Sequence, residues 1–236
     1  ADALGEVPGD GRIGEQEVTG LGYVELTASL IRRFGGEVRR EGRLWRVSER
    51  PLTGQAFAIG GDWSLAAFWL AAARISGRRI TLGGLDDQSP QNDRVAPSLF
   101  AALDDIPVAG EARVIDLSDT PDLLPPLAVA ALFADGETRL TGVAHARLKE
   151  SDRLTGLAMA FRRLGAEVEA GPGELRVKQA RALRPARLDP LGDHRLAMSF
   201  GILSLVVPGI EIPHKGLVAK SYPGFWETLE RFGSPP

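Results

Sequence analysis

The chain of 236 residues lacks cysteine altogether, which excludes disulfide bonds and thiolate metal ligands. Histidine is also scarce: there are three, and their spacing matches no metal-binding motif. We therefore expect no metal centre. The absence of cysteine is compatible with a reducing compartment, so we expect a cytoplasmic location.

Long apolar runs are missing as well. The longest, Leu123 to Phe133, is too short to cross a bilayer, and no signal-peptide pattern is present. The net charge of −3 argues against binding to nucleic acid or to a membrane surface. What remains is a globular chain, 44% hydrophobic, that is long enough for one large or two unequal domains.

The positive charge that is present is nearly all arginine, which can grip phosphates and carboxylates with two hydrogen bonds. The most informative stretch reads Arg-Leu-Lys-Glu-Ser-Asp-Arg at 147–153, between a predicted strand at 138–143 and a predicted amphipathic helix. A helix N-terminus prefers acidic neighbours by about 0.3–1 kcal/mol each. Lys149 and Arg153 therefore oppose stability there unless an anion binds, held by backbone N–H groups and both cations.

Three more predicted helix starts carry charged side chains. Asp-His-Arg at 193–195 opens an apolar run, and Asp122 follows a Thr-Pro pair. Lys220 precedes Ser-Tyr-Pro, of which Ser221 is expected to cap the next helix. If the four helix starts converge, they form an electropositive cup that contains two or three carboxylates. A ligand with phosphate or carboxylate groups is the first inference.

Two stretches of the chain are near-copies: Arg-Arg-Phe-Gly-Gly-Glu-Val at 32–38 and Arg-Arg-Leu-Gly-Ala-Glu-Val at 162–168. Each is predicted to end a helix at a left-handed glycine, Gly35 or Gly165, and to lead into a β-hairpin. The similarity indicates duplication of a unit of about sixty-five residues.

A weaker third copy is expected between these two, with a helix at 97–103 and strands at 107–109 and 113–115. A domain boundary is expected near residue 60, where a turn-rich segment precedes a new helix. We expect residues 1–59 to be the last repeat unit of a partner domain and residues 60–236 to be the main domain.

The 147–154 stretch closely matches the Arg-x-Lys-Glu-Ser/Thr-Asp-Arg-Leu signature of the 5-enolpyruvylshikimate-3-phosphate synthases, also called 3-phosphoshikimate 1-carboxyvinyltransferases. Further matches follow in the family's order: Tyr-Val-Glu-Leu-Thr at 23–27, Gly-Asp at 61–62, Thr-Pro-Asp at 120–122, Gly-Asp-His-Arg-Leu-Ala-Met at 192–198 and Ala-Lys-Ser-Tyr-Pro at 219–223. The resemblance implies an α/β fold (α+β by some schemes) of repeated βαβαββ units, with the active site between two domains and no cofactor.

The resemblance also implies transfer of the enolpyruvyl group of phosphoenolpyruvate to the 5-hydroxyl of shikimate 3-phosphate, with release of phosphate. By position, Asp122 matches the family's proton acceptor and Glu150 its second acid–base carboxylate. The other matched positions are substrate contacts: Lys149 and Tyr23 to the shikimate phosphate, Arg153, Arg195 and Lys220 to phosphoenolpyruvate, and His145 and Asp193 as further polar contacts.

Simpler interpretations compete with several of these roles. Asp122 could be only an early-helix acid and Asp193 a structural N-cap. Glu150 and Arg153 could form a surface ion pair worth less than about 1 kcal/mol. Tyr23 lies on a predicted apolar helix face, so core packing is the alternative for it.

The chain departs from the family pattern on its N-terminal side. The family's Leu-Pro-Gly-Ser-Lys-Ser turn, its Gly-Asn-Ala-Gly-Thr motif and its paired-serine–glutamine loop have no counterpart, and Gly60-Gly61-Asp62 stands where Glu-Gly-Asp is usual. We expect a C-terminal portion of such an enzyme, inactive until the missing N-terminal half is supplied. Two alternatives stay open: a non-catalytic anion-binding module and a truncated remnant without function.

Overall fold

The computed structural model describes residues 12–14, 21–42, 44–108 and 110–234. The α-helices of this part are α1 (Leu21–Arg33), α2 (Trp63–Ser76), α3 (Ala96–Ala101), α4 (Leu124–Ala131), α5 (Arg153–Arg163), α6 (His194–Leu203) and α7 (Phe225–Gly233). The strands are β1 (Arg12–Gly14), β2 (Val38–Glu41), β3 (Leu44–Val47), β4 (Ala112–Asp116), β5 (Glu137–Thr141), β6 (Val168–Ala170) and β7 (Leu175–Lys178). Short 3-10 helices lie between them: η1 (Asn92–Val95), η2 (Ala102–Asp104), η3 (Pro121–Leu123), η4 (Ala144–Leu148) and η5 (Lys215–Lys220).

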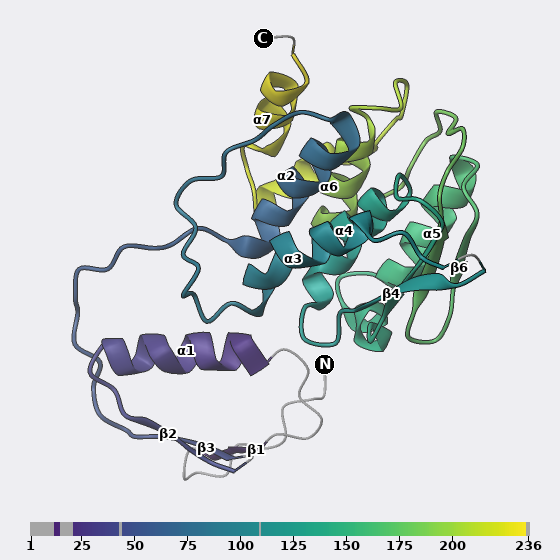
Figure 1. Cartoon of the computed structure of the whole chain (residues 1–236). Helices are drawn as coiled ribbons and strands as arrows, with labels where there is room; N and C mark the ends of the chain where they lie inside the picture. Colours follow the sequence, from purple (N-terminus) through teal and green to yellow (C-terminus); the bar gives the residue numbers. More distant parts are fainter. Residues whose placement is uncertain (1–11, 15–20, 43, 109, 235–236) are drawn as a thin grey trace.

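The larger part of the molecule is built on a four-stranded sheet in the order β4-β5-β7-β6 (Figure 1). β4 and β5 are parallel, with Val114 opposite Arg139. The other pairs are antiparallel, and Val177 of β7 lies opposite both Thr138 and Val168. With α4 and α5 the strands follow one another as β-α-β-α-β-β over residues 112–178, which is the unit that the resemblance implies.

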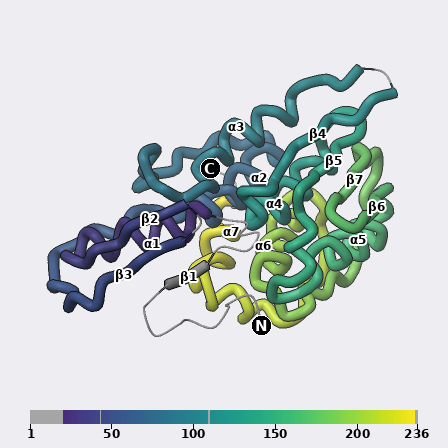
Figure 2. Tube along the Cα trace, turned by 90° about the horizontal axis from the view of Figure 1, so that it is seen from below, coloured from purple at the N-terminus to yellow at the C-terminus, as the bar shows by residue number. Residues whose placement is uncertain are grey.

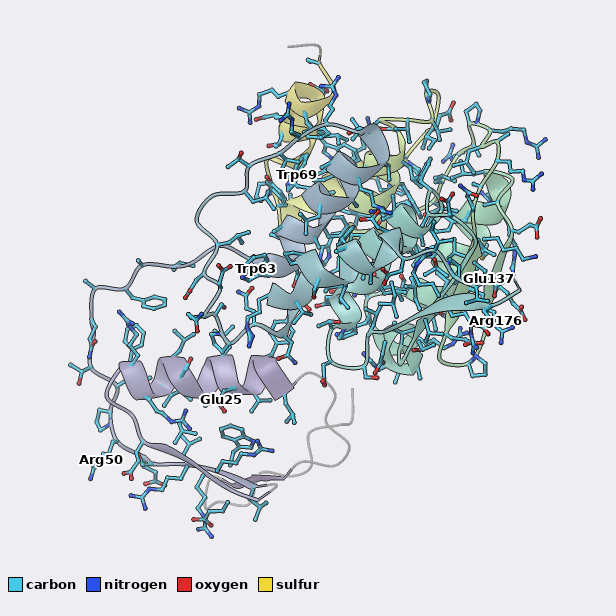
Figure 3. All side chains as sticks on the ribbon, in the orientation of Figure 1. Glu25, Arg50, Trp63, Trp69, Glu137 and Arg176 are labelled. Carbon is cyan, nitrogen blue, oxygen red and sulfur yellow. The ribbon has the colours of Figure 1, made fainter. Side chains whose placement is uncertain are left out.

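Helices cover one face of this sheet. α4 is buried on every side, because its residues are all apolar or proline. α2, α5 and α6 pack around α4, and α7 packs on α6. The other face carries the charged side chains of alternate strand residues, among them Glu137 and Arg176 (Figure 3). None of the described helices has the length and apolar character needed to cross a membrane.

The smaller part consists of α1 packed on a sheet in the order β1-β3-β2. Its core is small: Ala28, Val38 and Trp45 are buried, and they form a cluster separate from the main core. A long segment without helix or strand, residues 48–62, connects β3 to α2. Both views show the smaller part beside the larger one (Figures 1 and 2). A domain division at residue 60 stays a prediction.

Both copies of the seven-residue repeat have the predicted conformation. Gly35 follows α1 with φ of +83°, and Gly165 follows α5 with φ of +95°. A side chain is strained in this region, which explains the glycine. The chain then continues into the hairpins β2–β3 and β6–β7, as expected.

The expected third copy is wrong in its hairpin, although its helix and second strand are present: α3 and η2 cover residues 97–103, and β4 covers residues 113–115. Residues 107–108 form no strand, Ala109 lies outside the described residues, and β4 pairs in parallel with β5. Pro107 has no N–H to offer a ladder. The carbonyl of Asp105 is taken by the Arg113 side chain, whose Nε donates to it at 3.0 Å.

The expected capping role of Ser221 is also wrong. A 3-10 turn extends to Lys220, and the Ser221 N–H bonds back to the Val218 carbonyl. α7 begins only at Phe225, with Gly224 at its N-cap.

Candidate active site

Cations from three different segments surround the carboxylate of Asp122. Its Oδ1 lies 2.7 Å from Arg153 Nη1 and 3.8 Å from Lys149 Nζ, and its Oδ2 lies 3.2 Å from Arg195 Nη2. Asp122 itself is in η3, just before α4, whereas Arg153 opens α5 and Arg195 is in the first turn of α6. The predicted convergence of helix starts is therefore confirmed.

Arg153 lies at the centre of this cluster. Its side chain is 1% exposed, and each of its nitrogens binds a different carboxylate: Nε binds Asp193 at 2.7 Å, Nη1 binds Asp122 at 2.7 Å and Nη2 binds Glu150 at 2.8 Å. The surface-pair interpretation of Glu150 and Arg153 is therefore wrong. A buried guanidinium is stable only with such compensation.

Asp193 combines a capping role with a role in the cluster. It is fully buried at the N-cap of α6, where its Oδ1 accepts the Arg195 N–H at 2.8 Å. Its Oδ2 accepts from Arg153 and from the Ser151 hydroxyl. Through Asp193, the start of α6 is tied to the start of α5.

Lys220 joins the cluster through Glu150 rather than through Asp122. Its Nζ lies 2.7 Å from Glu150 Oε1. Burial raises the pKa of Glu150, but the hydrogen bond from Lys220 and the charges of Arg153 and Lys220 outweigh it and lower the pKa to about 2. Glu150 is therefore ionised at neutral pH. We name these seven residues the Asp122 cluster: Asp122, Lys149, Glu150, Arg153, Asp193, Arg195 and Lys220.

The cluster also sets the charge of its neighbours. Burial acts to raise the pKa of Asp122, but Arg195, Lys149 and Arg153 hold it below its usual range. Burial and the charge of Lys149 lower the pKa of His145, and burial and Arg195 lower that of His194. Asp122 is thus an anion at pH 7 and both imidazoles are neutral.

Two residues that sequence reasoning missed lie against this cluster, Ser64 in the first turn of α2 and Asp93 in η1. They are 2% and 1% exposed, and the Ser64 hydroxyl is hydrogen-bonded to Asp93 Oδ2. The Tyr23 hydroxyl, from α1, lies 3.1 Å from Ser64 Oγ, 3.1 Å from Asp93 Oδ2 and 3.4 Å from Asp122 Oδ2. Core packing is therefore the wrong account of Tyr23.

No signal in the sequence marks Asp93. It lies in a polar, turn-rich stretch that is typical of a surface loop, and only the packing of η1 against α2 buries it. Trp63, the first residue of α2, also holds the segment before η1 in place (Figure 3). Its Nε1 donates to the Asp86 carbonyl at 3.0 Å.

Two nitrogen atoms beside the cluster are buried and lack a hydrogen-bond partner, Arg195 Nη1 and His145 Nε2. A buried polar atom without a partner is rare, so an available donor such as Arg195 Nη1 is suited to an anionic ligand. In the part of the chain that the structure describes, no group of three or more His, Asp or Glu side chains is placed to hold a metal ion.

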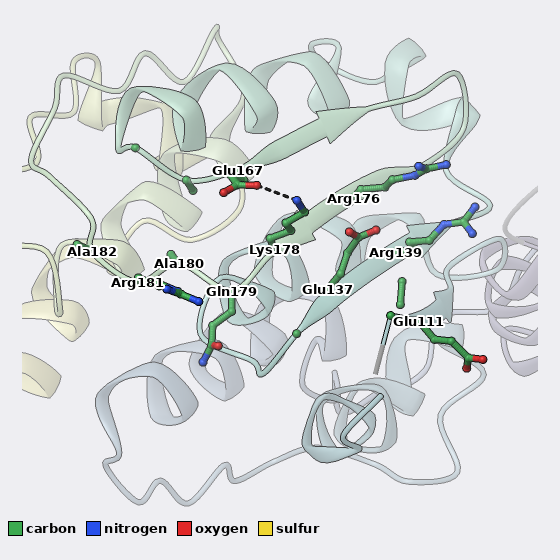
Figure 4. A pocket seen from close by; sticks show the side chains of 15 residues that line it. Glu111, Glu137, Arg139, Glu167, Arg176, Lys178, Gln179, Ala180, Arg181 and Ala182 are labelled. Atoms are coloured by element: carbon green, nitrogen blue, oxygen red, sulfur yellow. Dashed lines mark hydrogen bonds and ion pairs between the residues drawn. The ribbon is translucent and has the colours of Figure 1, made fainter. Parts of the chain in front are cut away.

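A large cavity lies elsewhere, on the outer face of the sheet (Figure 4). It has a volume of about 1040 Å³ and is lined by charged strand residues such as Glu137 and Arg139. Two of its charges are paired with each other, since Lys178 Nζ lies 2.8 Å from Glu167 Oε2. Exposed pairs of this kind contribute little, and none of the Asp122 cluster lines the cavity. The cluster is therefore the better candidate site.

Solved structures with the same fold are enolpyruvyl transferases. EPSP synthase from Acinetobacter baumannii superimposes with a TM-score of 0.73 at 23% identity, covering 95% of this chain and 57% of that one. The enolpyruvyl transferase NikO from Streptomyces tendae superimposes with a TM-score of 0.65 at 16% identity, covering 95% and 55%. The chain thus belongs to the class of α/β proteins with an enolpyruvyl transferase-like fold.

Within that class, the chain belongs to the EPSP synthase (3-phosphoshikimate 1-carboxyvinyltransferase) family, whose model matches residues 10–229. A relative of that name from Methanoregula boonei is 36% identical over 223 residues, 89% of this chain and 53% of the relative. Another from Methanoculleus marisnigri is 37% identical over 221 residues, 88% and 52%. The chain spans about half the length of these curated relatives. The predicted family and fold class are confirmed.

Proposed function

We propose that this chain supplies one side of the active site of an enzyme that transfers the enolpyruvyl group of phosphoenolpyruvate to shikimate 3-phosphate and releases phosphate, in the shikimate pathway to aromatic amino acids. The observation that carries the proposal is the Asp122 cluster, where four cations from separate segments enclose two acid–base carboxylates. A cytoplasmic location is part of the proposal.

The cations suit the substrates, which together bring two phosphates and two carboxylates. Within the cluster, Asp122, Glu150 and Asp193 offset three of the four positive charges. Lys149 and Tyr23 are assigned to the shikimate phosphate. Phosphoenolpyruvate is assigned to Arg153, Arg195 and Lys220, and His145 is assigned to the same substrate. Arg195 Nη1 is buried without a hydrogen-bond partner and is available to donate to phosphoenolpyruvate.

Three proton transfers are needed for the reaction. In the first step a base takes the proton of the 5-hydroxyl as its oxygen bonds to C2 of phosphoenolpyruvate, and an acid protonates C3. In the second step the C2–O bond to phosphate breaks and a proton leaves the new methyl group. Asp122, anionic at neutral pH, is assigned as the base of the first step.

Glu150 and Lys220 are assigned the two proton transfers at C3 of phosphoenolpyruvate. Because the pKa of Glu150 is about 2, this carboxylate is a poor proton donor and suits the removal of the methyl proton. The Lys220 ammonium, 2.7 Å from Glu150, is the group that holds a proton for C3. A carboxylate paired with a lysine thus divides the acid and base roles.

The test measures turnover and binding of the chain with and without a fragment that supplies the missing N-terminal half. We expect phosphate release and cooperative binding of both substrates only with the fragment, and loss of at least about 100-fold in turnover for Lys220→Met. Lys178→Met, an exposed lysine outside the site, is the matched control and should be unaffected. Turnover by the chain alone would contradict the need for a second half.

Two other results of these measurements would favour an alternative to the enzyme. Binding of inorganic phosphate by calorimetry, without cooperativity or turnover in the presence of the fragment, would favour an anion-binding module. Absence of a cooperative thermal melt by circular dichroism would favour a remnant without function.

A further inference from the structure

Asp93 is a buried carboxyl group that no step proposed above uses. Only 1% of it is exposed, its Oδ2 is hydrogen-bonded to the hydroxyls of Ser64 and Tyr23, and its Oδ1 has no partner. None of the ion pairs within the described residues includes Asp93, whereas Asp122 is paired with three cations. The two carboxyl groups are connected through a single phenol, that of Tyr23.

This arrangement decides which of the two acids carries the charge. An ionised carboxylate that is buried without a cation, and with one bare oxygen, is strongly disfavoured. A second anion beside Asp122 is disfavoured further by repulsion. The titratable and charged groups that face Asp93 are Tyr23 from α1, Asp122 from η3 and Arg195 from α6. Burial and Asp122 raise the pKa of Asp93 and outweigh Arg195 and the hydrogen bonds, in agreement with a retained proton.

We propose that Asp93 is a positioning residue of the transferase site: it keeps a proton and, through the hydroxyls of Ser64 and Tyr23, orients the ionised carboxylate of Asp122. With Asp93 neutral, one order of donors satisfies three of the four contacts, all except the one between Tyr23 Oη and Asp93 Oδ2. The Asp93 O–H donates to Ser64 Oγ, the Ser64 O–H donates to Tyr23 Oη, and the Tyr23 O–H donates to Asp122 Oδ2. Every donor then points toward the single anion, and hydrogen bonds in such a chain reinforce one another.

The hydroxyl groups that orient the Asp122 base come from both parts of the fold. Tyr23 comes from α1 of the smaller part, while Ser64 and Asp93 come from the larger part. The chain of hydroxyls therefore holds α1 against the site. The Tyr23 hydroxyl shares Asp122 Oδ2 with Arg195, while Arg153 and Lys149 lie at Oδ1. The inference rests on the proposed function, but its central claim, a protonated Asp93, is measurable without turnover.

The first experiment measures protonation in the intact chain by carbon-13 NMR of the side-chain carboxyl groups. We expect Asp93 to keep the chemical shift of a protonated acid at pH values one or more units above the ordinary aspartate pKa of about 3.9. The carboxyl signal of Asp87, which is exposed, serves as the internal control. Titration of Asp93 together with Asp87 would overturn the proposal, whatever the enzyme's activity.

The second experiment measures kinetics of the chain joined by its N-terminal fragment. Asp93→Ala should lower kcat by roughly ten-fold with little change in KM, because it loosens the base and leaves substrate contacts in place. Asp93→Asn, a neutral donor of the same shape, should restore most of that loss, and Asp87→Asn should have no effect. If Asp93→Asn is as damaging as Asp93→Ala, the neutral form is not the working one and the proposal fails. Ser64→Ala interrupts the same series of hydrogen bonds with a smaller change in structure. Its kcat is expected to fall as much as that of Asp93→Ala, and a normal kcat in this variant would also overturn the proposal.

Discussion

At the residue scale, the site depends on compensation between buried charges. Each of the three nitrogens of the Arg153 side chain pairs with a different carboxylate. Asp193 accepts from Arg153 with one oxygen and caps α6 with the other. The geometry of the guanidinium fork is what allows one side chain to do this, since an ammonium is a point charge on a flexible stem.

Arg153→Lys should therefore destabilise the fold although it keeps the charge. A lysine at this position cannot reach Asp122, Glu150 and Asp193 together, so buried carboxylates lose their partner. We expect a loss of about 3 kcal/mol in the free energy of unfolding, measured by urea denaturation. Arg181→Lys, at an exposed position with no hydrogen bond or ion pair in the structure, is the control and should change stability by less than about 0.5 kcal/mol.

The protonation of Asp93 predicts a distinctive dependence of stability on pH. Because the folded-state pKa is raised above the unfolded value of about 3.9, the native state binds more protons, and stability falls as pH rises from that value through the folded pKa. Asp93→Asn removes this loss. Relative to the parent, the variant should gain about 1.4 kcal/mol for each unit by which the pKa is raised, once the pH exceeds the folded pKa. Thermal melts across pH measure this, and a constant difference at all pH values would contradict it.

At the element scale, the fold brings together the N-terminal ends of α5 and α6 and the η3 turn before α4. α4 is central, because it is buried on every side, and α5 and α6 both pack on it. The close approach of α6 and α7 fixes the segment just before α7, which carries Lys220. Gly201 of α6 allows this contact, since a Cβ there would lie 2.8 Å from a Trp226 ring atom and 2.9 Å from a Phe225 ring atom.

Gly201→Ala should therefore be destabilising, although alanine is the better helix former by about 1 kcal/mol. Overpacking against two rings costs about 1–3 kcal/mol, so we expect a net loss of about 1 kcal/mol in urea denaturation. Gly156→Ala in α5 is the matched control. Its Cβ would meet only the methyl ends of two leucines, Leu191 and Leu196, and it should be neutral or stabilising. Equal effects of the two substitutions would show that ring contact is not the cause.

At the scale of the whole molecule, the two parts differ greatly in core size. Among the described residues of α1 and its sheet, the buried apolar cluster consists of Ala28, Val38 and Trp45, whereas the larger part has an extensive cluster centred on α4. The contacts of Tyr23 with Ser64, Asp93 and Asp122 are polar links between the two parts. The smaller part therefore contributes to the site while having little apolar packing of its own.

Hydrogen exchange should reflect this difference. We expect the amides of α1, β2 and β3 to exchange at least ten-fold faster than those of α4 and α6, because they open without disrupting the main core. Tyr23→Phe, which removes the hydroxyl link, should accelerate exchange in α1 and leave α4 unchanged. Mass spectrometry of peptic fragments measures both, and equal protection of the two parts would contradict the prediction.

The sequence by itself determined the elements and most of the cluster. Helix ends at Gly35 and Gly165, the two hairpins and the charged helix starts follow from local rules, because turns, caps and periodicity act over a few residues. The family resemblance, which rests on matched motifs, led to the same residues around Asp122. The failures were also local. Pro107 has no N–H for a strand ladder, and the Ser221 N–H bonds to the Val218 carbonyl at the end of a 3-10 turn.

Only the tertiary structure decided which acids are charged. Asp93 and Asp122 are both aspartates in short 3-10 turns, and no sequence rule distinguishes them. One is enclosed by Lys149, Arg153 and Arg195 from distant segments, and the other by two hydroxyls and no cation. Protonation depends on the balance between burial and nearby charge, and that balance exists only once the helix starts have come together.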